Sequence, residues 1–386
     1  LEVDAVVVGS GPNGLTAACM LAAAGRSVIV VEGAEVAGGG MRTAELTLPG
    51  FRHDLCSAVH PMGVLSPAFR ELQLEAHGLR WCDSLTSYAH PLDDRPAAIA
   101  GLSLDETAAG LGVDAQAWRA MCAPFLADPE ALFRDLLAPL QVPGQPLTMA
   151  RFGLRALRSA RGFARAWFAD EPARALFAGC AGHATQPLDN PLTAAFGLVF
   201  AISAHAKPWP VAEGGSQAIA DALIRVLTTH GGRIETGRRV ASLDDLPPSK
   251  AVFFDIAPTQ VADIAGEALP AGYRDRLRRY VYGPGSFKLD WALDGPIPWA
   301  DSRVVQASTV HVGGTIDEIA ASESAVWKGE HPERPFLILC QQSQLDPTRS
   351  PQGKHTGYAY CHVPHGSNLD RTAAIEAQIE RFAPGF

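Results

Sequence analysis

Short apolar runs and glycine turns alternate along the first part of the chain. Residues 4–8 form an apolar, β-branched run, residues 15–24 have the composition of a helix, and residues 27–31 form a second apolar run that ends at Glu32. The sequence Gly-Ser-Gly-Pro-Asn-Gly separates the first run from the helix. This order of strand, glycine turn, helix and strand predicts a βαβ unit that binds a dinucleotide.

The residues of this turn each meet a separate physical need. Gly9 allows a tight turn out of the strand, Gly11 lets the backbone approach a pyrophosphate, and Gly14 lets the helix pack closely on the strand. Pro12 begins the helix, where its missing N–H costs nothing. The remaining free N–H groups and the positive end of the helix dipole would then face the phosphates.

Glu32 stands 18 positions after Gly14, close to the spacing of about 20 expected for the carboxylate that accepts the ribose hydroxyls. A second glycine cluster, residues 37–43, follows where a nicotinamide-only Rossmann domain would usually continue into a helix and a third strand. Its backbone N–H groups, with Arg42 as a fixed cation, would neutralise the other side of the pyrophosphate. Glu32 and this loop together favour FAD as the dinucleotide.

The stretches GSGPNG, VVEGAEVAGGGMRT and GFRHDLCSAVHPMGVLSPAF resemble the phytoene desaturase-like FAD-dependent oxidoreductases, relatives of the amine oxidase type flavoproteins. The similarity returns at residues 209–216 and 231–240, and more loosely at residues 357–366 and 381–386. The resemblance implies bound FAD, with the backbone of Val240 touching the adenine. The residues that it implies for the rest of the FAD site are Gly9, Gly11, Pro12, Asn13, Gly14, Glu32, Gly39, Gly40, Met41 and Arg42.

One part of the family pattern is missing from the sequence. Family members close the flavin site with a C-terminal glycine-rich segment, and the sequence ends at residues 383–386 without one, just as it begins at Leu1 without Met. An open face of the isoalloxazine ring loses buried area and shape complementarity. We therefore expect the 386-residue chain to hold FAD weakly or not at all.

The order of patterns predicts an α/β protein. Its parts are a Rossmann-like FAD-binding domain, a helical insertion, and a substrate domain with a mixed or antiparallel sheet. The predicted boundaries are residues 1–90 for the first part of the FAD-binding domain, 91–209 for the helical lid or substrate insertion, 210–283 for the second part of the FAD-binding domain, and 284–386 for the substrate-domain sheet.

Periodicity assigns elements to the last three segments. Residues 104–206 are rich in Ala, Leu and Arg with helical spacing, interrupted by prolines, and residues 216–229 form an amphipathic helix. The strands predicted after residue 230 lie at 233–235, 239–243, 251–256, 286–293, 303–312, 335–340 and 357–363. The last four strands would wall the substrate cavity.

Composition agrees with a globular enzyme, since 47% of the residues are hydrophobic and 19% are charged. The net charge of −9 argues against a nucleic-acid partner, which would require a broad basic face. The seven cysteines are scattered and contain no CxxC pair, which indicates a reducing cytoplasm. The apolar run at residues 192–204 is too short to cross a membrane, which needs about 20 residues.

Residues 149–168 read as one basic amphipathic helix with two interpretations. The helix would either lay the lid on the inner face of a membrane and admit apolar substrate, or pack its aromatic side on the protein core and leave its arginines in water. The second interpretation is favoured, because an acidic protein needs no membrane to solvate a cationic stripe. The arginines of the stripe are Arg151, Arg155, Arg158, Arg161 and Arg165, and the facing apolar residues are Phe152, Leu157, Phe163, Trp167 and Phe168.

Other polar residues also allow two interpretations. His60 is either a hydrogen-bonding neighbour of the flavin ring or a structural histidine held by a backbone partner. Lys288 would reach the flavin through a water or lie on the solvated surface, and the surface is favoured. A zinc set is disfavoured, since adjacent residues of a strand point to opposite faces, and no metal site is predicted. The residues of that set would be His355, Cys361, His362 and His365.

No acid-base pair stands out, which fits flavin chemistry, in which the cofactor takes the hydride and the protein supplies orientation and dryness. The expected reaction removes two hydrogens from an apolar or extended small molecule. Catalytic residues are not assigned. A redox-neutral flavin-dependent isomerase, or a non-catalytic flavoprotein that acts as an assembly partner, would show the same motifs.

Overall fold

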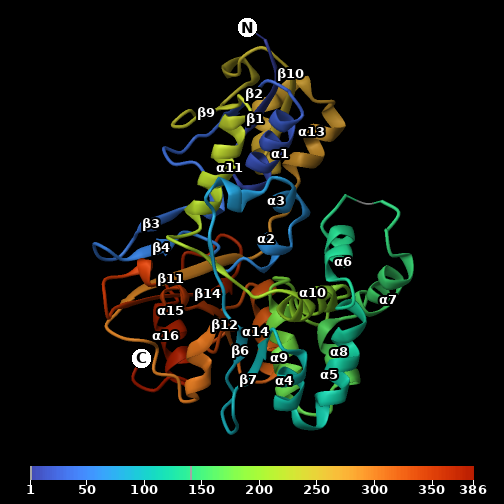
Figure 1. The fold of residues 1–386 in the computed structure, drawn as a ribbon, viewed down its shortest axis with the longest axis vertical. Helices are drawn as coiled ribbons and strands as arrows, with labels where there is room; N and C mark the ends of the chain where they lie inside the picture. Colours follow the sequence, from blue (N-terminus) through green and yellow to red (C-terminus); the bar gives the residue numbers. More distant parts are fainter. Residues whose placement is uncertain (1, 140) are drawn as a thin grey trace.

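A computed structural model describes residues 2–139 and 141–386. Its upper part in Figure 1 is built on a four-stranded parallel sheet in the order β10-β1-β2-β9. The strands are β1 (Val3–Val8), β2 (Val28–Val31), β9 (Arg233–Glu235) and β10 (Ser249–Phe254). β1 and β2 are apolar along almost their whole length because both faces of a parallel sheet are covered.

Helices α1 (Pro12–Ala23) and α11 (Gln217–Thr229) cover one face of this sheet. Leu15 and Leu223 are fully buried between these helices and the sheet. On the other face, Val6 and Ile29 pack with the segment around Val240 and with helix α12 (Pro258–Ala265). The βαβ unit predicted from the glycine turn is confirmed, with element ends shifted by one to three residues.

The lower part is built on a six-stranded mixed sheet in the order β11-β14-β13-β12-β6-β7. Only the β12–β6 pairing is parallel. The strands are β6 (Thr86–His90), β7 (Ala98–Gly101), β11 (Gly285–Leu293), β12 (Ala307–Val312), β13 (Leu337–Cys340) and β14 (His355–Val363). Helix α16 (Thr372–Glu380) packs on one face, and helices α9 (Glu171–Gly182) and α10 (Thr193–Ala206) pack on the other.

The helical insertion lies beside this sheet, at the lower right of Figure 1. Its other helices are α4 (Leu104–Gly110), α5 (Ala115–Cys122), α6 (Pro129–Leu136), α7 (Pro146–Ala156) and α8 (Ala160–Trp167). Among the prolines that interrupt the pattern, Pro129 and Pro146 begin helices, at first helical positions where no N–H is needed.

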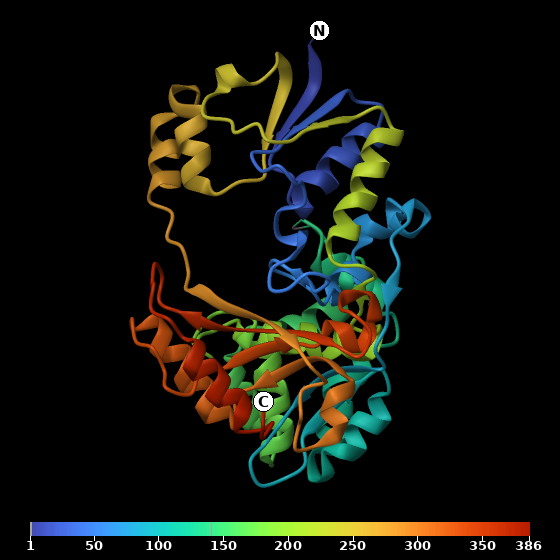
Figure 2. The same ribbon diagram turned by 90° about the vertical axis from the view of Figure 1, so that its left-hand side faces the viewer.

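The remaining elements are short or lie at the edges. The helices are α2 (Pro61–Leu65), α3 (Pro67–Glu71), α13 (Ala271–Arg278), α14 (Ile316–Trp327) and α15 (Gln342–Leu345). The strands form two small antiparallel pairs, β3 (Thr43–Glu45) with β4 (Arg52–Asp54), and β5 (Trp81–Cys82) with β8 (Val211–Ala212). Figure 2 shows the two sheets as an upper and a lower half, joined on one side by the extended segment between α13 and β11.

Two predicted elements are wrong, and the strand expected over residues 303–312 begins only at Ala307, because Ser302–Gln306 form a 3-10 helix. The single helix expected over residues 149–168 is two helices, α7 and α8, because Ser159 caps the second one by accepting a hydrogen bond from the N–H of Gly162. The strand expected over residues 239–243 is a loop, since the Asp245 carboxylate takes the N–H groups of Ala241 and Ser242 that a strand would give to its neighbour.

One predicted domain boundary also differs from the structure. Residues 86–90 were predicted to end the first FAD-binding segment, whereas β6 pairs with β12 and β7 in the six-stranded sheet. The strand is recognisable from its sequence, but β12, one of its two partners, lies more than two hundred residues away, and local periodicity does not reveal this pairing. Within residues 2–139 and 141–386, no helix combines the length and apolarity needed to cross a membrane.

Candidate functional site

The glycine turn after β1 forms a close-packed cradle at the N-terminus of α1. Gly9 has a φ of +100°, which favours glycine, and Gly11 caps the helix that Pro12 begins. A Cβ added at Gly14 would lie 2.5 Å from the carbonyl oxygen of Gly9. Helix and turn therefore pack as the motif predicts, and α1 presents its first N–H groups at the end of β1.

Asp255, just after β10, completes this cradle. Its Oδ2 accepts a hydrogen bond of 2.8 Å from the N–H of Gly14. The same oxygen would lie 2.6 Å from a Cβ added at Gly11. A carboxylate at a helix N-terminus is favourable for the helix dipole. The sequence reading did not identify Asp255, because its contact with the turn joins residues 241 positions apart.

The second glycine cluster lies directly against the first. A Cβ added at Gly39 would lie 2.8 Å from the Cα of Gly11. Gly39–Met41 form a 3-10 turn, and Nε of Arg42 donates to the carbonyl of Gly39 at 3.0 Å. Met41 is buried, while Gly40 is partly exposed. The structure thus brings together both loops that the sequence assigned to the pyrophosphate.

Glu32 ends β2 beside these loops. Its carboxylate accepts hydrogen bonds from the N–H and hydroxyl of Ser10 and from the N–H of Ala34, at 2.9, 2.5 and 2.8 Å. Burial alone would raise the pKa of Glu32, but these donors lower it below its ordinary value. Glu32 is therefore an anionic acceptor at the strand end. Val240 lies in the apolar layer on the face of the four-stranded sheet opposite α1 and α11, in one cluster with Val31.

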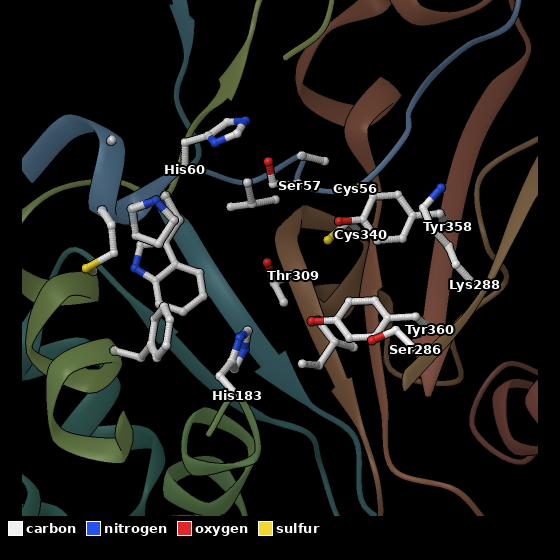
Figure 3. Close-up of a pocket in the computed structure, with 18 of the residues that line it drawn as sticks. Cys56, Ser57, His60, His183, Ser286, Lys288, Thr309, Cys340, Tyr358 and Tyr360 are labelled. Atoms are coloured by element: carbon white, nitrogen blue, oxygen red, sulfur yellow. The ribbon is translucent and has the colours of Figure 1, made fainter. Parts of the chain in front are cut away.

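A cavity of about 630 Å³ lies where the segment after β4 meets the six-stranded sheet (Figure 3). Residues 55–63 form one wall, and β11, β14, β13 and β12 contribute another. Apolar side chains, among them Trp209, Phe200 and Ile338, line it together with several polar groups. The labelled polar residues are Ser57, His60, His183, Ser286, Lys288, Thr309, Tyr358 and Tyr360.

His60 lies in the wall that carries residues 55–63. Its Nε2 lies 2.8 Å from Oγ of Ser216, and this hydroxyl also donates to the carbonyl of Ser57 at 2.6 Å. Burial lowers the pKa of His60 to about 4, so the imidazole is neutral near pH 7. Its structural partner is a serine hydroxyl rather than the backbone group that was expected, and the same ring lines the cavity.

Lys288 was expected at the solvated surface, and that expectation is wrong. Its side chain is 18% exposed, its Nζ pairs with the Asp290 carboxylate at 2.5 Å, and it lies 4.5 Å from the ring centre of Tyr358. Lys288 lines the cavity on β11. The alternation of β11 in the sequence could have indicated that Lys288 faces a polar site, because Ser286, Lys288 and Asp290 share one face of the strand while apolar residues occupy the other.

Three residues of the cavity wall were not expected from the sequence. His183, at the end of α9, lies with its Nε2 2.9 Å from Nε2 of His311, and burial lowers the pKa of His183 to about 3. Tyr358 and Tyr360 follow on β14, where burial raises the pKa of each phenol. The alternate positions of residues 358, 360 and 362 on one strand would have grouped the β14 side chains on one face.

The residues weighed as a zinc set have other partners. Nδ1 of His362 lies 2.8 Å from Oε2 of Glu323, while Nδ1 of His355 lies 3.3 Å from the hydroxyl of Ser343. Nδ1 of His365 lies 3.2 Å from a backbone carbonyl. Across the described part of the chain, no group of three His, Cys, Asp or Glu residues is arranged to hold a metal ion.

The arginines of the predicted cationic stripe contact protein groups. Arg155 donates to the carbonyl of Met121 and lies 4.7 Å from the ring centre of Trp167. Arg161 and Arg165 both pair with Asp317 on α14. Arg151 and Arg158 are exposed. These contacts favour the interpretation in which the two helices pack on the protein core, and membrane contact stays an untested prediction.

Comparison with known proteins adds sequence evidence. The family model described as NAD(P)-binding Rossmann-like domain matches residues 7–72. The chain is 27% identical to pyridine nucleotide-disulfide oxidoreductase domain-containing protein 2 of Rattus norvegicus, across 100% of this chain and 79% of that protein. It is 26% identical to phytoene dehydrogenase of Streptomyces griseus, across 93% of this chain and 73% of that protein.

A solved structure shares the fold. An oxidoreductase from Methanosarcina mazei matches with a TM-score of 0.63 and 18% identity, covering 99% of this chain and 85% of that chain. The likeness therefore extends over the helical insertion and the six-stranded sheet as well as the nucleotide-binding half.

Proposed function

We infer that this chain, with the motifs of phytoene desaturase-like proteins and the fold of a solved oxidoreductase, is an FAD-dependent oxidoreductase of the desaturase and amine oxidase type. We propose that it removes two hydrogens from an apolar or extended small molecule bound in the cavity. The observation that supports this most is the position of the cavity. Its wall, residues 55–63, continues directly from the loop and hairpin that follow the glycine cradle.

The cradle fits the pyrophosphate and ribose of FAD. Gly11 and Gly39 bring two backbone segments so close that a Cβ at either position would meet neighbouring atoms below 3 Å. The N-terminus of α1, whose Gly14 N–H bonds to Asp255, offers its remaining N–H groups to an anion, Arg42 adds a cation, and Glu32 is an acceptor suited to ribose hydroxyls. When bound, FAD would supply the site that accepts a hydride.

The residues of the cavity would then bind the substrate and exclude water. Trp209, Phe200 and Ile338 offer apolar surface to a hydrocarbon chain. His60 and His183 stay neutral near pH 7 and place no charge against it. Lys288, held by Asp290 and the face of Tyr358, places a fixed positive charge at the other side of the cavity.

FAD binding is tested by titrating the purified protein with FAD while its flavin fluorescence is recorded. We expect weak but saturable binding, and we expect Gly11→Val to weaken it by at least tenfold, because the side chain would press on the Asp255 carboxylate and crowd the cradle that the phosphates approach. Gly110→Val is the matched control, since a Cβ there meets nothing within 4 Å. Equal affinity in both variants contradicts the cradle assignment.

The reaction type is tested by mixing the FAD-loaded protein with apolar candidate substrates without oxygen. A dehydrogenase loses the visible absorbance of oxidised flavin. A redox-neutral isomerase requires flavin reduced beforehand and converts substrate without net oxidation, and a non-catalytic flavoprotein shows neither effect. Either of these two results contradicts the proposed oxidation.

A further inference from the structure

A buried carboxylate and a buried imidazole meet at the wall of the cavity formed by β14 and the end of α9. His362 lines the cavity, and its Nδ1 lies 2.8 Å from Oε2 of Glu323 on α14. The two side chains are 4% and 2% exposed. The other carboxylate oxygen of Glu323 is buried and has no hydrogen-bond partner among the described residues. The proposed function so far assigns no role to this pair.

The pairing fixes the orientation of the imidazole. A carboxylate buried with a single hydrogen-bond partner is costly unless that partner donates to it, so Nδ1 of His362 carries the proton directed at Glu323. In the neutral imidazole with this tautomer, Nε2 presents its lone pair on the side of the ring away from Glu323, beside Thr185, another residue of the cavity wall. This is the arrangement in which a carboxylate orients a histidine for proton transfer.

Nε2 of His362 is available for a further hydrogen bond. Three histidines of the described chain line the cavity. His60 uses its Nε2 on Ser216, and His183 uses its Nε2 on His311. The contact between Nε2 of His362 and Oγ1 of Thr185 is 3.5 Å, at the limit of a hydrogen bond.

Thr185 itself is held in an unusual backbone conformation. Its φ of +52° lies in the left-handed region, which a β-branched residue rarely adopts. Trp327 fixes it by donating its indole N–H to the Thr185 carbonyl at 2.9 Å. Thr185 closes the turn that ends α9, where its N–H donates to the carbonyl of Gly182 at 3.1 Å, and this turn fixes its hydroxyl beside Nε2 of His362.

The charge of the cavity limits the polar group that it would accept. None of the described residues that line the cavity is acidic, whereas Lys288 is a cation. An ammonium group would therefore enter without a counter-ion, because the Glu323 carboxylate is already bonded to His362. A neutral hydroxyl needs only one acceptor, and Nε2 of His362 is such an acceptor.

We propose that the substrate is an apolar alcohol, that its hydroxyl donates a hydrogen bond to Nε2 of His362, and that His362 removes the hydroxyl proton while Glu323 orients it. This inference rests on the proposed function. The O–H bond and the adjacent C–H bond break and a C=O bond forms. The proton goes to Nε2 of His362, the C–H electron pair leaves as a hydride to the FAD of the proposed function, and His362 passes its proton to water as the carbonyl product leaves.

Recognition is tested by calorimetric titration with 1-octanol and 1-fluorooctane, which differ in the hydroxyl group. The wild-type protein should bind octanol about fivefold more tightly, the effect of one hydrogen bond. His362→Asn still reaches Glu323 but ends short of Nε2, so the preference should fall to about one. His355→Asn, on the same strand but outside the cavity, should retain the wild-type preference.

Proton removal is tested by flavin reduction with 1-octanol in the absence of oxygen. His362→Gln places an amide oxygen near the position of Nε2, so it should bind octanol as the wild type does yet reduce flavin at least a hundredfold more slowly. Glu323→Gln keeps an acceptor for Nδ1 without the charge. It should lower the maximal reduction rate while leaving the octanol affinity unchanged, which separates a positioning role from a structural one.

Two results overturn the inference: an unchanged octanol preference in His362→Asn, or wild-type reduction by His362→Gln. A wild-type protein that does not distinguish octanol from fluorooctane overturns it as well. The binding comparison requires no flavin, so it decides recognition even if the protein fails to bind FAD. A protein that keeps the octanol preference and binds FAD, yet whose flavin no candidate substrate reduces, would refute the proposed function separately.

Discussion

Replacing Arg349 by methionine should destabilise the protein strongly, because its guanidinium is wholly buried between two carboxylates. Its Nη1 donates to Asp54 at 2.9 Å, its Nε donates to Asp346 at 2.8 Å, and its Nη2 donates to the carbonyl of Ala212 at 3.2 Å. All three charged side chains are 0% exposed. Methionine fills similar volume but leaves two buried carboxylates without a cation.

The expected loss in the free energy of unfolding is about 3–5 kcal/mol, the cost of breaking a buried pair from one side. The lower end of this range is favoured, because Asp54 keeps two other hydrogen bonds in the variant. It accepts from the N–H of Ser216 and from the hydroxyl of Thr43, both at 2.7 Å. The double variant Arg349→Met with Asp54→Asn should recover about 1 kcal/mol or more, because one buried charge is then removed.

Urea denaturation, followed by circular dichroism, measures the free energy of unfolding of the single and the double variant. Arg119→Met is the matched control, because its pair with Asp105 is exposed at 40% and 83% of the two side chains and should contribute less than about 1 kcal/mol. If Arg349→Met and Arg119→Met lower the free energy of unfolding equally, the buried network does not stabilise the fold as argued.

Three further predictions concern acid stability, packing and the cofactor. Burial lowers the pKa of His90 from 6.5 to about 4, so the unfolded chain binds the proton first as the pH falls. The free energy of unfolding should therefore fall by about 3 kcal/mol as the pH drops from 6.5 to 4. His90→Gln should flatten the dependence of the urea midpoint on pH, and an unchanged slope would contradict the assignment. Gly197→Ala places a Cβ 2.4 Å from the ring of Phe177 and should destabilise by about 1–3 kcal/mol in the same urea assay, so a wild-type midpoint would show that the helices can separate freely. Arg42→Ala should weaken FAD binding by about 2 kcal/mol in the fluorescence titration, and unchanged affinity would remove Arg42 from the site.

The nucleotide-binding half was predictable because its signals are local. The turn around Gly11, the acid at the end of β2 and the second loop lie within a short span of sequence, and each has one physical reason to be there. The prediction of a mixed sheet after residue 284 is likewise confirmed, since alternation marks β11 and a short apolar run marks β13. The order of the strands could not be predicted from alternation, because it depends on pairings between distant segments such as β6 and β12.

The composition of the cavity wall could not be predicted from the sequence. Lys288 and His362 looked like a surface residue and a weak metal ligand because their neighbours in sequence are not their neighbours in space. Glu323 belongs to an amphipathic helix in which a glutamate is ordinarily solvated, and only the packing of α14 near β14 buries it. A buried charge can be recognised in a sequence only when its partner is nearby, and His362, the partner of Glu323, lies 39 residues away.

The network around Arg349 also explains how one short segment can serve both halves of the site. Thr43, the last residue of the second glycine cluster, donates to Asp54 and accepts from the N–H of Gln217 at the start of α11. Asp54 immediately precedes the cavity wall, and Arg349 ties it to the segment between β13 and β14 of the six-stranded sheet. The loop proposed to hold the pyrophosphate and the wall proposed to hold the substrate are therefore fixed by the same buried ion pair. A change at Arg349 should disturb cofactor affinity and octanol affinity together, whereas a change at Arg42 should disturb only the first.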